Sequence, residues 1–122
     1  MRSSIKDLPV AAEMTEGTVC QVTWGEMTIE AGHLIKDIDT ASMLKGLPDD
    51  RCQCPHWGYV LKGQMRLKFA DHEEVYGAGE LYHAQPGHVA FLEAGCEYIE
   101  FSPTEEYDKT MEVAERNMNA QK

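Results

Sequence analysis

Features that would assign the chain to a membrane, secreted or multidomain class are missing from the sequence. It has no apolar run long enough to span a bilayer. Its N-terminal segment carries Lys6 and Asp7, where a secretion signal needs an unbroken apolar stretch. Internal repeats, low-complexity tracts and Gly/Ser linkers are also missing. A chain of 122 residues fits one domain. We therefore expect a single cytoplasmic domain without a membrane partner.

Basic residues are scarce and scattered. The chain has 11 Lys and Arg against 21 Asp and Glu, which gives a formal net charge of −10. A nucleic-acid-binding face needs clustered Lys and Arg to neutralise phosphates. We therefore expect no nucleic-acid partner, and we interpret the acidic excess as a solvated exterior that favours solubility.

The sequence has only four cysteines, Cys20, Cys52, Cys54 and Cys96. A secreted disulfide framework is one interpretation, but a cytoplasmic location favours free thiols or metal ligands. On an extended strand Cys52 and Cys54 point the same way with Cα atoms about 6.5–7 Å apart, which does not suit a disulfide. Cys20 and Cys96 are expected to pack as buried thiols.

Short segments with strand character follow one another through most of the chain. Residues 18–32 are rich in β-branched and aromatic residues, and residues 64–69 alternate polar and apolar without a break. Gly or Pro stands at nearly every junction, which is typical of a sandwich or barrel. Residues 37–50 read as a connecting loop, with one helical turn at 41–46. The predicted fold class is therefore all-β with a C-terminal α-helix.

The C-terminal helix has a recognisable start. Ser102 suits the N-cap, Pro103 the first helical position, and Glu105 completes a capping box. One face of this helix is expected to pack against the barrel or a second subunit, and it carries Tyr107, Met111, Ala114 and Met118. We divide the chain into an N-terminal arm (1–17), a barrel (18–103) and a C-terminal helix and tail (104–122).

Two segments resemble the sequence motifs of the cupin superfamily. Residues 59–63, Tyr-Val-Leu-Lys-Gly, resemble the end of the first cupin motif. Gly79, followed by a strand and then by Pro86-Gly87-His88, resembles the second motif. The resemblance implies that residues 18–103 form a single-domain cupin, a double-stranded β-helix or jelly-roll barrel. It also implies a small-molecule ligand or substrate and, since small cupins commonly dimerise, a homodimer.

The usual metal ligands of that superfamily are replaced in this chain. Metal-binding cupins typically present two His and a Glu from the first motif and a His from the second. Those positions fall on Asp50, Cys52, His56 and Ala90. None of the four has the residue type that the family uses at its position, so the resemblance does not imply the iron or manganese chemistry of the family for this chain.

A different ligand set stands at the same place. Alternate residues of segment 50–56 would share a face if the strand is regular through Pro55, and the resemblance implies that this face points inward. His88 has the same parity as Ala90 and would face the same cavity. The predicted metal ligands are therefore Cys52, Cys54, His56 and His88. Tetrahedral Zn²⁺ suits this set best, with Fe or Cu as alternatives. Three ligands would leave a coordination position open, whereas four would close the site.

Two functions remain open from the sequence. The first is a metal-dependent cupin enzyme, with isomerase, lyase or dioxygenase chemistry on a small polar molecule that enters beside Trp57 and loop 46–50. The alternative is a non-catalytic module that binds a small ligand or metal, or senses redox state through Cys52 and Cys54. No residue is selected as catalytic, and the carboxylates that could move protons are Glu80, Glu93 and Glu100.

Overall fold

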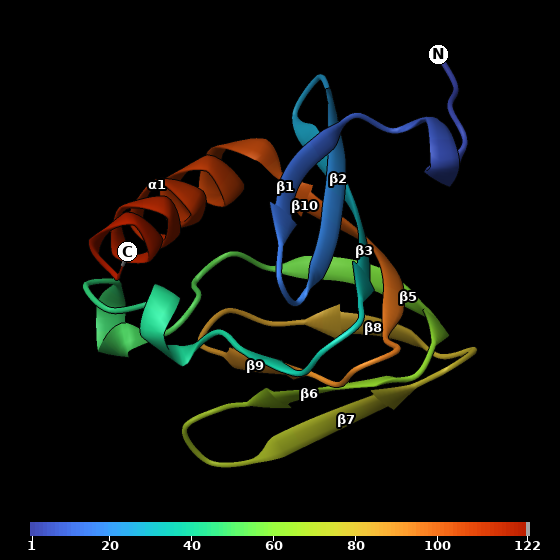
Figure 1. The fold of residues 1–122 in the computed structure, drawn as a ribbon. Coiled ribbons are helices and arrows are strands. Elements are labelled where there is room, and N and C mark those ends of the chain that lie inside the picture. The colour runs from blue at the N-terminus through green and yellow to red at the C-terminus, as the bar shows by residue number, and fades with distance from the viewer. Residues whose placement is uncertain (122) are drawn as a thin grey trace.

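A computed structural model describes residues 1–121 of the chain (Figure 1). The described residues form ten strands, three short 3₁₀ turns and one α-helix. In chain order the elements are η1 (Ile5–Asp7), β1 (Val10–Met14), β2 (Gly17–Trp24), β3 (Met27–Leu34), β4 (Ile38–Asp39), η2 (Ala41–Met43), η3 (Pro48–Asp50), β5 (His56–Lys62), β6 (Gln64–Lys68), β7 (Glu73–Gly77), β8 (Leu81–Ala84), β9 (Val89–Leu92), β10 (Glu97–Pro103) and α1 (Thr104–Ala120). The all-β fold with a C-terminal helix is confirmed.

The strands form two sheets. The larger has the order β1-β2-β3-β10-β5-β8 and the smaller the order β4-β9-β6-β7. Neighbouring strands are antiparallel throughout. The alternation that predicted a half-buried strand at residues 64–69 is confirmed in β6, where Met65 and Leu67 are buried. The predicted helical turn after residue 40 is confirmed as η2.

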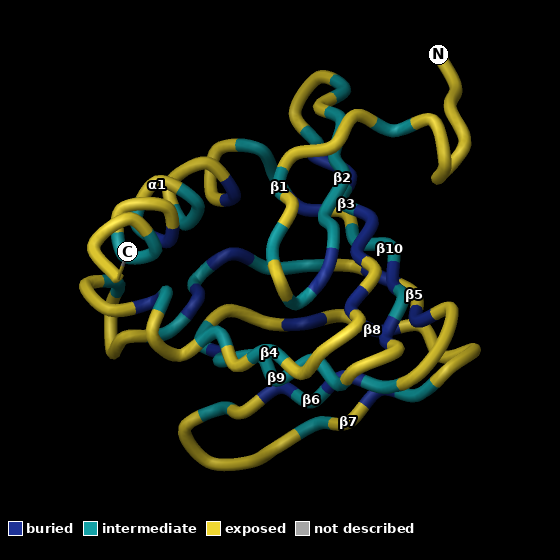
Figure 2. Tube along the Cα trace, viewed as in Figure 1, coloured by how far each residue is buried: buried dark blue, intermediate teal, exposed yellow. Residues whose placement is uncertain are grey.

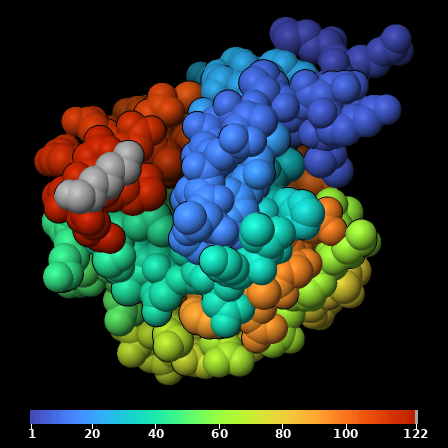
Figure 3. Space-filling model, viewed as in Figure 1, coloured from blue at the N-terminus to red at the C-terminus, as the bar shows by residue number. Residues whose placement is uncertain are grey.

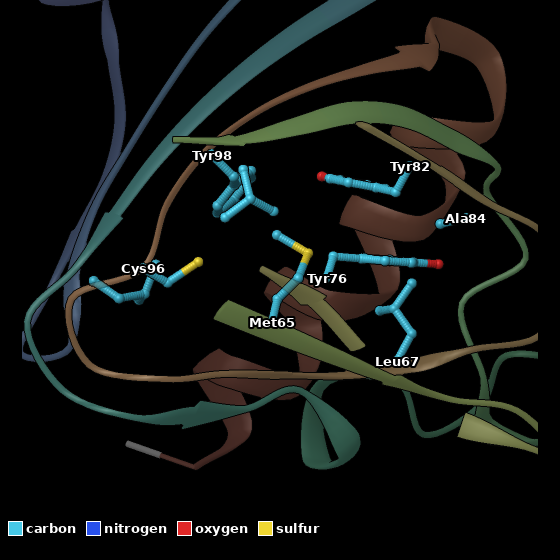
Figure 4. Close-up of a cluster of buried hydrophobic side chains, with 9 residues drawn as sticks. Met65, Leu67, Tyr76, Tyr82, Ala84, Cys96 and Tyr98 are labelled. Atoms are coloured by element: carbon cyan, nitrogen blue, oxygen red, sulfur yellow. The ribbon is translucent and has the colours of Figure 1, made fainter. Parts of the chain in front are cut away.

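Apolar side chains from both sheets meet in one core between them. Its buried members are Leu34, Val60, Met65, Leu67, Tyr76, Tyr82, Ala84, Cys96 and Tyr98. The rings of Tyr76 and Tyr82 stack, with centroids 4.6 Å apart and planes 6° from parallel (Figure 4). Burial of this apolar surface is the main force that holds the sheets together.

The N-terminal segment only partly behaves as a free arm. Residues 1–9 are mostly exposed (Figure 2). Val10–Met14, however, form β1, which pairs with β2 and lengthens the larger sheet at its edge. The expected arm therefore contributes a strand beside the interior.

The predicted N-cap of the C-terminal helix is wrong. Ser102 lies within β10, opposite Thr28 of β3, and its hydroxyl bonds to His56 rather than to a helix N–H. The helix begins at Thr104, after Pro103, and no side chain caps it. Sheet pairing therefore continues through the residues whose local pattern favoured a cap.

The predicted apolar stripe of α1 does face the body of the protein. Tyr107 and Ala114 are buried, and Met111 packs against a small cluster that contains Leu44 and Cys52. The opposite face of α1 is exposed (Figure 2). Within residues 1–121, no helix combines the length and apolarity needed to cross a bilayer.

Candidate metal centre

Three of the predicted ligands converge at one point inside the molecule. Cys52, His56 and His88 each offer one ligand atom, and these atoms all lie within 4.8 Å of one another. The Sγ atom of Cys52 lies 3.7 Å from Nε2 of His56. The two imidazole rings have centroids 5.0 Å apart.

The three side chains come from two parts of the chain, residues 52–56 and residue 88, and backbone hydrogen bonds join these parts. Cys52 and His88 form an isolated antiparallel bridge, in which the Cys52 N–H donates to the His88 carbonyl at 2.8 Å. The N–H groups of Gly87 and His88 donate to the Cys52 carbonyl at 2.7 and 3.2 Å. His56 is the first residue of β5, beside β10. This backbone pairing brings the Cys52 and His88 side chains next to each other at the start of β5.

Cys54, the fourth predicted ligand, lies next to the cluster rather than in it. The regular strand that the prediction required does not form, because η3 ends at Asp50 and β5 begins only at His56. The Cys54 thiol is fully buried and points toward the carbonyl of Pro55 at 3.4 Å. It lines the same cavity as the cluster. The Asp50 carboxylate is used elsewhere, since it accepts the N–H of Gly46 at 3.0 Å.

Hydrogen bonds from outside the cluster orient both imidazoles. Nδ1 of His88 lies 2.8 Å from the carbonyl oxygen of Gln85. A carbonyl only accepts, so this nitrogen carries the hydrogen and Nε2 keeps its lone pair. Nδ1 of His56 lies 2.7 Å from Oγ of the buried Ser102, while its Nε2 faces Cys52. Outer partners of this kind fix the tautomer of metal-binding histidines.

Burial sets the protonation of the cluster. It lowers the pKa of His56 and of His88 to about 4, so both rings are neutral near pH 7. It raises the pKa of Cys52 to about 11, so the sulfur is a thiol. The 3.6 Å contact between Nδ1 of His56 and Glu100 is therefore not an ion pair. A cation that binds here would displace one proton from Cys52.

Two buried carboxylates face the same cavity, each held by tyrosine hydroxyls. Tyr98 and Tyr107 donate to the two oxygens of Glu30 at 2.6 and 2.7 Å. Tyr82 donates to Glu100 at 2.8 Å. Burial raises the pKa of Glu100 to about 7 and also raises the pKa of Glu30, with the nearby Glu100 charge acting in the same direction.

Glycines make room for two of these tyrosines. Tyr98 lies opposite Gly32 in the β3–β10 pair, and a Cβ on that glycine would meet the Tyr98 ring at 2.3 Å. Tyr82 lies opposite Gly58 in the β5–β8 pair, with the same 2.3 Å approach. Each ring therefore lies flat over a strand that has no side chain there, and its hydroxyl reaches a carboxylate.

Sequence reasoning missed several of these groups. It offered three glutamates without choosing, and only Glu100 lines the cavity. Glu80 is exposed and accepts the N–H of Gly77, while Glu93 accepts from Gln64. Glu30 was not considered, although it shares the strand face of the buried Thr28.

The cluster lines a cavity of about 150 Å³. Cys54, both carboxylates and Ala90, the position where the cupin resemblance places a ligand His, contribute to its wall. Trp57 does not line it, so the expected entry beside Trp57 is wrong. Its ring stacks on His83, with centroids 4.7 Å apart, because neighbouring residues of β5 point to opposite faces of the sheet.

Comparison with models of known protein families and with curated protein sequences finds no match. Solved structures do match. Oxalate decarboxylase of Bacillus subtilis aligns with 83% of this chain at a TM-score of 0.59 and 17% identity. The polyketide cyclase RemF of Streptomyces resistomycificus aligns with 84% of this chain and 78% of its own, at 0.59 and 16%. An RmlC-like cupin of Shewanella frigidimarina aligns with 83% of this chain and 88% of its own, at 0.56 and 16%.

These likenesses establish the fold. The chain has a cupin fold, as the two sequence motifs predicted. It spans only 28% of the length of the oxalate decarboxylase chain.

Proposed function

We propose that this protein is a metal-dependent cupin that holds a divalent cation between Cys52, His56 and His88 and acts on a small molecule beside it. The observation that carries the proposal is the convergence of three ligand atoms from separate segments, with both imidazoles oriented from outside. A cysteine that only packs in an apolar core is surrounded by apolar side chains, whereas Cys52 faces two neutral imidazoles.

The donor set fits zinc. Typical Zn–S and Zn–N bonds in a tetrahedron place sulfur and nitrogen about 3.6 Å apart. The Cys52 and His56 ligand atoms are separated by 3.7 Å. One sulfur and two nitrogens also suit Fe or Cu, which stay as alternatives. Since Cys54 stands outside the cluster, three protein ligands leave a coordination position for water or substrate.

The surrounding residues favour proton-transfer chemistry, as in an isomerase or lyase. A cation bound here would polarise a carbonyl or hydroxyl of the substrate. Glu100 lines the cavity, and in the metal-free protein burial raises the pKa of its carboxyl to about 7. A carboxyl beside the substrate is a candidate to take up or release a proton. Tyr82 holds its carboxylate in position. The oxalate decarboxylase and the polyketide cyclase act, by their names, on small molecules, and we propose a small-molecule substrate here as well.

The thiols do not favour the alternative function as a redox sensor. A sensing cysteine needs an accessible thiolate. Burial instead raises the pKa of Cys52 to about 11 and that of Cys54 to about 12.

We also propose a cytoplasmic homodimer. The helix stripe faces the protein's own interior, so the apolar surface left for a partner is the outer face of the larger sheet. Its exposed members include Trp57, Tyr59, Leu81 and Phe101. Light scattering after size exclusion should give twice the 13.7 kDa chain mass, and Phe101→Glu should give the monomer. A monomeric wild type would refute the dimer.

Cobalt titration tests the metal site. Co²⁺ in place of zinc should give a thiolate-to-cobalt absorption band at one equivalent, because Cys52 would be a ligand. His88→Ala should remove the band. His72→Ala is the matched control, since His72 is exposed and bonded to Asp71 and Glu74. Cys54→Ser should keep the band.

An open position has its own readout. Added imidazole should shift the cobalt spectrum of the wild type if it replaces a bound water. A wild type without the thiolate band, or equal loss in both histidine variants, would contradict the metal site. A cobalt spectrum that imidazole leaves unchanged would mean that the metal has no open coordination position, which would contradict an enzymatic role.

A further inference from the structure

A second and larger cavity lies between α1 and the β1–β2 hairpin. Its volume is about 590 Å³. β1, β2, η2 and α1 all contribute lining residues. Figures 1 and 3 show the helix and the hairpin next to each other on one face of the molecule. We call this space the outer chamber.

The outer chamber adjoins the metal cavity. The residues that line both are Glu30, Thr40, Leu92, Tyr98, Tyr107 and Met111. These shared residues form the wall between the two spaces, so a molecule in the chamber lies next to the cavity that holds Cys52, His56 and His88. The helix thus forms one wall of a binding site.

The chamber lining is apolar and adaptable. Four methionines contribute to it, Met14, Met43, Met111 and Met118. Unbranched thioether side chains adjust to irregular apolar shapes and contact aromatic rings favourably. A volume in this range suits a ligand of the size of a drug molecule.

The charges at the site are of one sign. No Lys or Arg lines either cavity among the described residues. Asp108, Glu112 and Glu115 of α1 lie along the chamber, and Glu30 lies at its inner end. An anionic molecule would find no cationic side chain here, so the chamber disfavours it.

One buried polar group in the chamber has no partner. The Oε1 atom of Gln21 is buried and accepts no hydrogen bond from residues 1–121. Gln21 lines the chamber and lies opposite Glu30 in the β2–β3 pair. A buried acceptor without a partner costs free energy, and a ligand N–H or O–H would remove that cost.

We infer that the substrate is a largely apolar molecule without a negative charge, of about 15–25 non-hydrogen atoms, sized to the chamber. Its body lies among the methionines, a donor group bonds to Gln21, and its reacting end points toward the wall shared with the metal cavity. That the bound molecule is a substrate rests on the proposed function. Binding in the chamber itself needs no metal.

A matched pair of fluorescent probes tests the chamber in metal-free protein. N-phenyl-1-naphthylamine is neutral, apolar and carries one N–H, and 8-anilinonaphthalene-1-sulfonate adds an anionic group to the same rings. The neutral probe should bind with enhanced, blue-shifted emission, and its Kd should be at least about tenfold lower than that of the sulfonate. Equal binding of both probes, or none by the neutral one, would overturn the inference.

Variants locate the bound probe. Val19→Trp fills the chamber from β2 and should raise the Kd of the neutral probe at least about tenfold. Gln21→Leu keeps the size of the side chain but removes the acceptor, and should raise it about threefold. Val75→Ala is the control, because Val75 is exposed and lines neither cavity. Circular dichroism confirms that each variant is folded.

Probe and metal results separate the two proposals. Probe binding without a cobalt band would leave the chamber standing and refute the proposed function. A cobalt band without probe binding would do the reverse. Should Val19→Trp stay folded and bind the probe like the wild type, the chamber would not be the site.

Discussion

Two buried cysteines, at different places in the same interior, show what distinguishes a packing residue from a ligand. Cys96 and Cys52 are both buried, and burial raises the pKa of each thiol to about 11. Cys96, however, belongs to the apolar core between the sheets, with Met65 and Tyr98 (Figure 4). Cys52 faces two neutral imidazoles. The neighbours of a thiol, rather than its burial, therefore indicate a metal site.

The same contrast extends to the energetics of the two regions. The core around Cys96 contributes stability through apolar burial. The region around Cys52 holds two imidazoles and two carboxylates away from water, which opposes folding unless each is hydrogen-bonded. Ser102, Gln85 and three tyrosines supply those bonds. We infer that the core offsets the cost of assembling the site.

The largest expected effect comes from exchanging each cysteine for alanine. Cys52→Ala should lower zinc affinity at least about 1000-fold, more than the loss of an outer partner causes, because a ligand is removed. Cys96→Ala should leave zinc affinity within about twofold but lower the free energy of unfolding by about 1–2 kcal/mol, since it creates a small cavity. Competition with a chromophoric chelator and urea unfolding measure the two quantities. Similar zinc affinity in both variants would remove the distinction.

A smaller effect, on the pH dependence of stability, should follow from Glu100→Gln. In metal-free protein Glu100 has its pKa raised from 4.5 to about 7, so the folded state holds this proton more tightly than the unfolded state. Wild type should lose stability relative to Glu100→Gln as pH rises from about 4.5 to 7. The difference should reach on the order of 3 kcal/mol above pH 7. The histidine contributions are common to both proteins and cancel.

Urea unfolding at a series of pH values gives this difference directly. Glu80→Gln is the matched control, because Glu80 is exposed and lines neither cavity. If the two glutamine variants followed the same pH profile, Glu100 would not be the group that carries the proton.

The smallest effect is expected from Ser102→Ala. Loss of the hydroxyl leaves Nδ1 of His56 without its 2.7 Å partner, which should weaken zinc binding about 10-fold. Ser42→Ala, on exposed η2, is the control. A binding constant unchanged by Ser102→Ala would mean that the orientation of His56 does not depend on this bond.

The sequence predicted the strands well and the site in part, because both predictions depend on patterns within short segments of the chain. Alternation in residues 64–69 and the two cupin-like motifs located the strands and the positions of Cys52, His56 and His88. Cys54 stands outside the cluster because the chain between η3 and β5 is not a regular strand, so the alternation of strand faces does not apply there. The Ser102 cap failed since β10 continues to pair with β3.

Other features depend on contacts that are distant in sequence. The tyrosines that hold Glu30 are 68 and 77 residues away from it along the chain. The outer chamber is formed by β1 and α1, from opposite ends of the described chain. No local pattern indicates such neighbours. The position of Glu30 on the inward face of β3, however, follows from the alternation of side chains along a strand, because Glu30 lies two residues after the buried Thr28.

Substitution of the glycines beneath the two tyrosines would change the acidity of the carboxylates without replacing any residue that lines the cavity. Gly32 and Gly58 lie against the Tyr98 and Tyr82 rings, whose hydroxyls donate to Glu30 and Glu100. A methyl group at either position would meet the tyrosine ring and displace its hydroxyl from one carboxylate. At position 58 it would also meet the carbonyl oxygen of Ile99 at 2.7 Å. Natural variants or designs could therefore change the acidity of Glu30 and Glu100 separately, from two backbone positions outside the cavity.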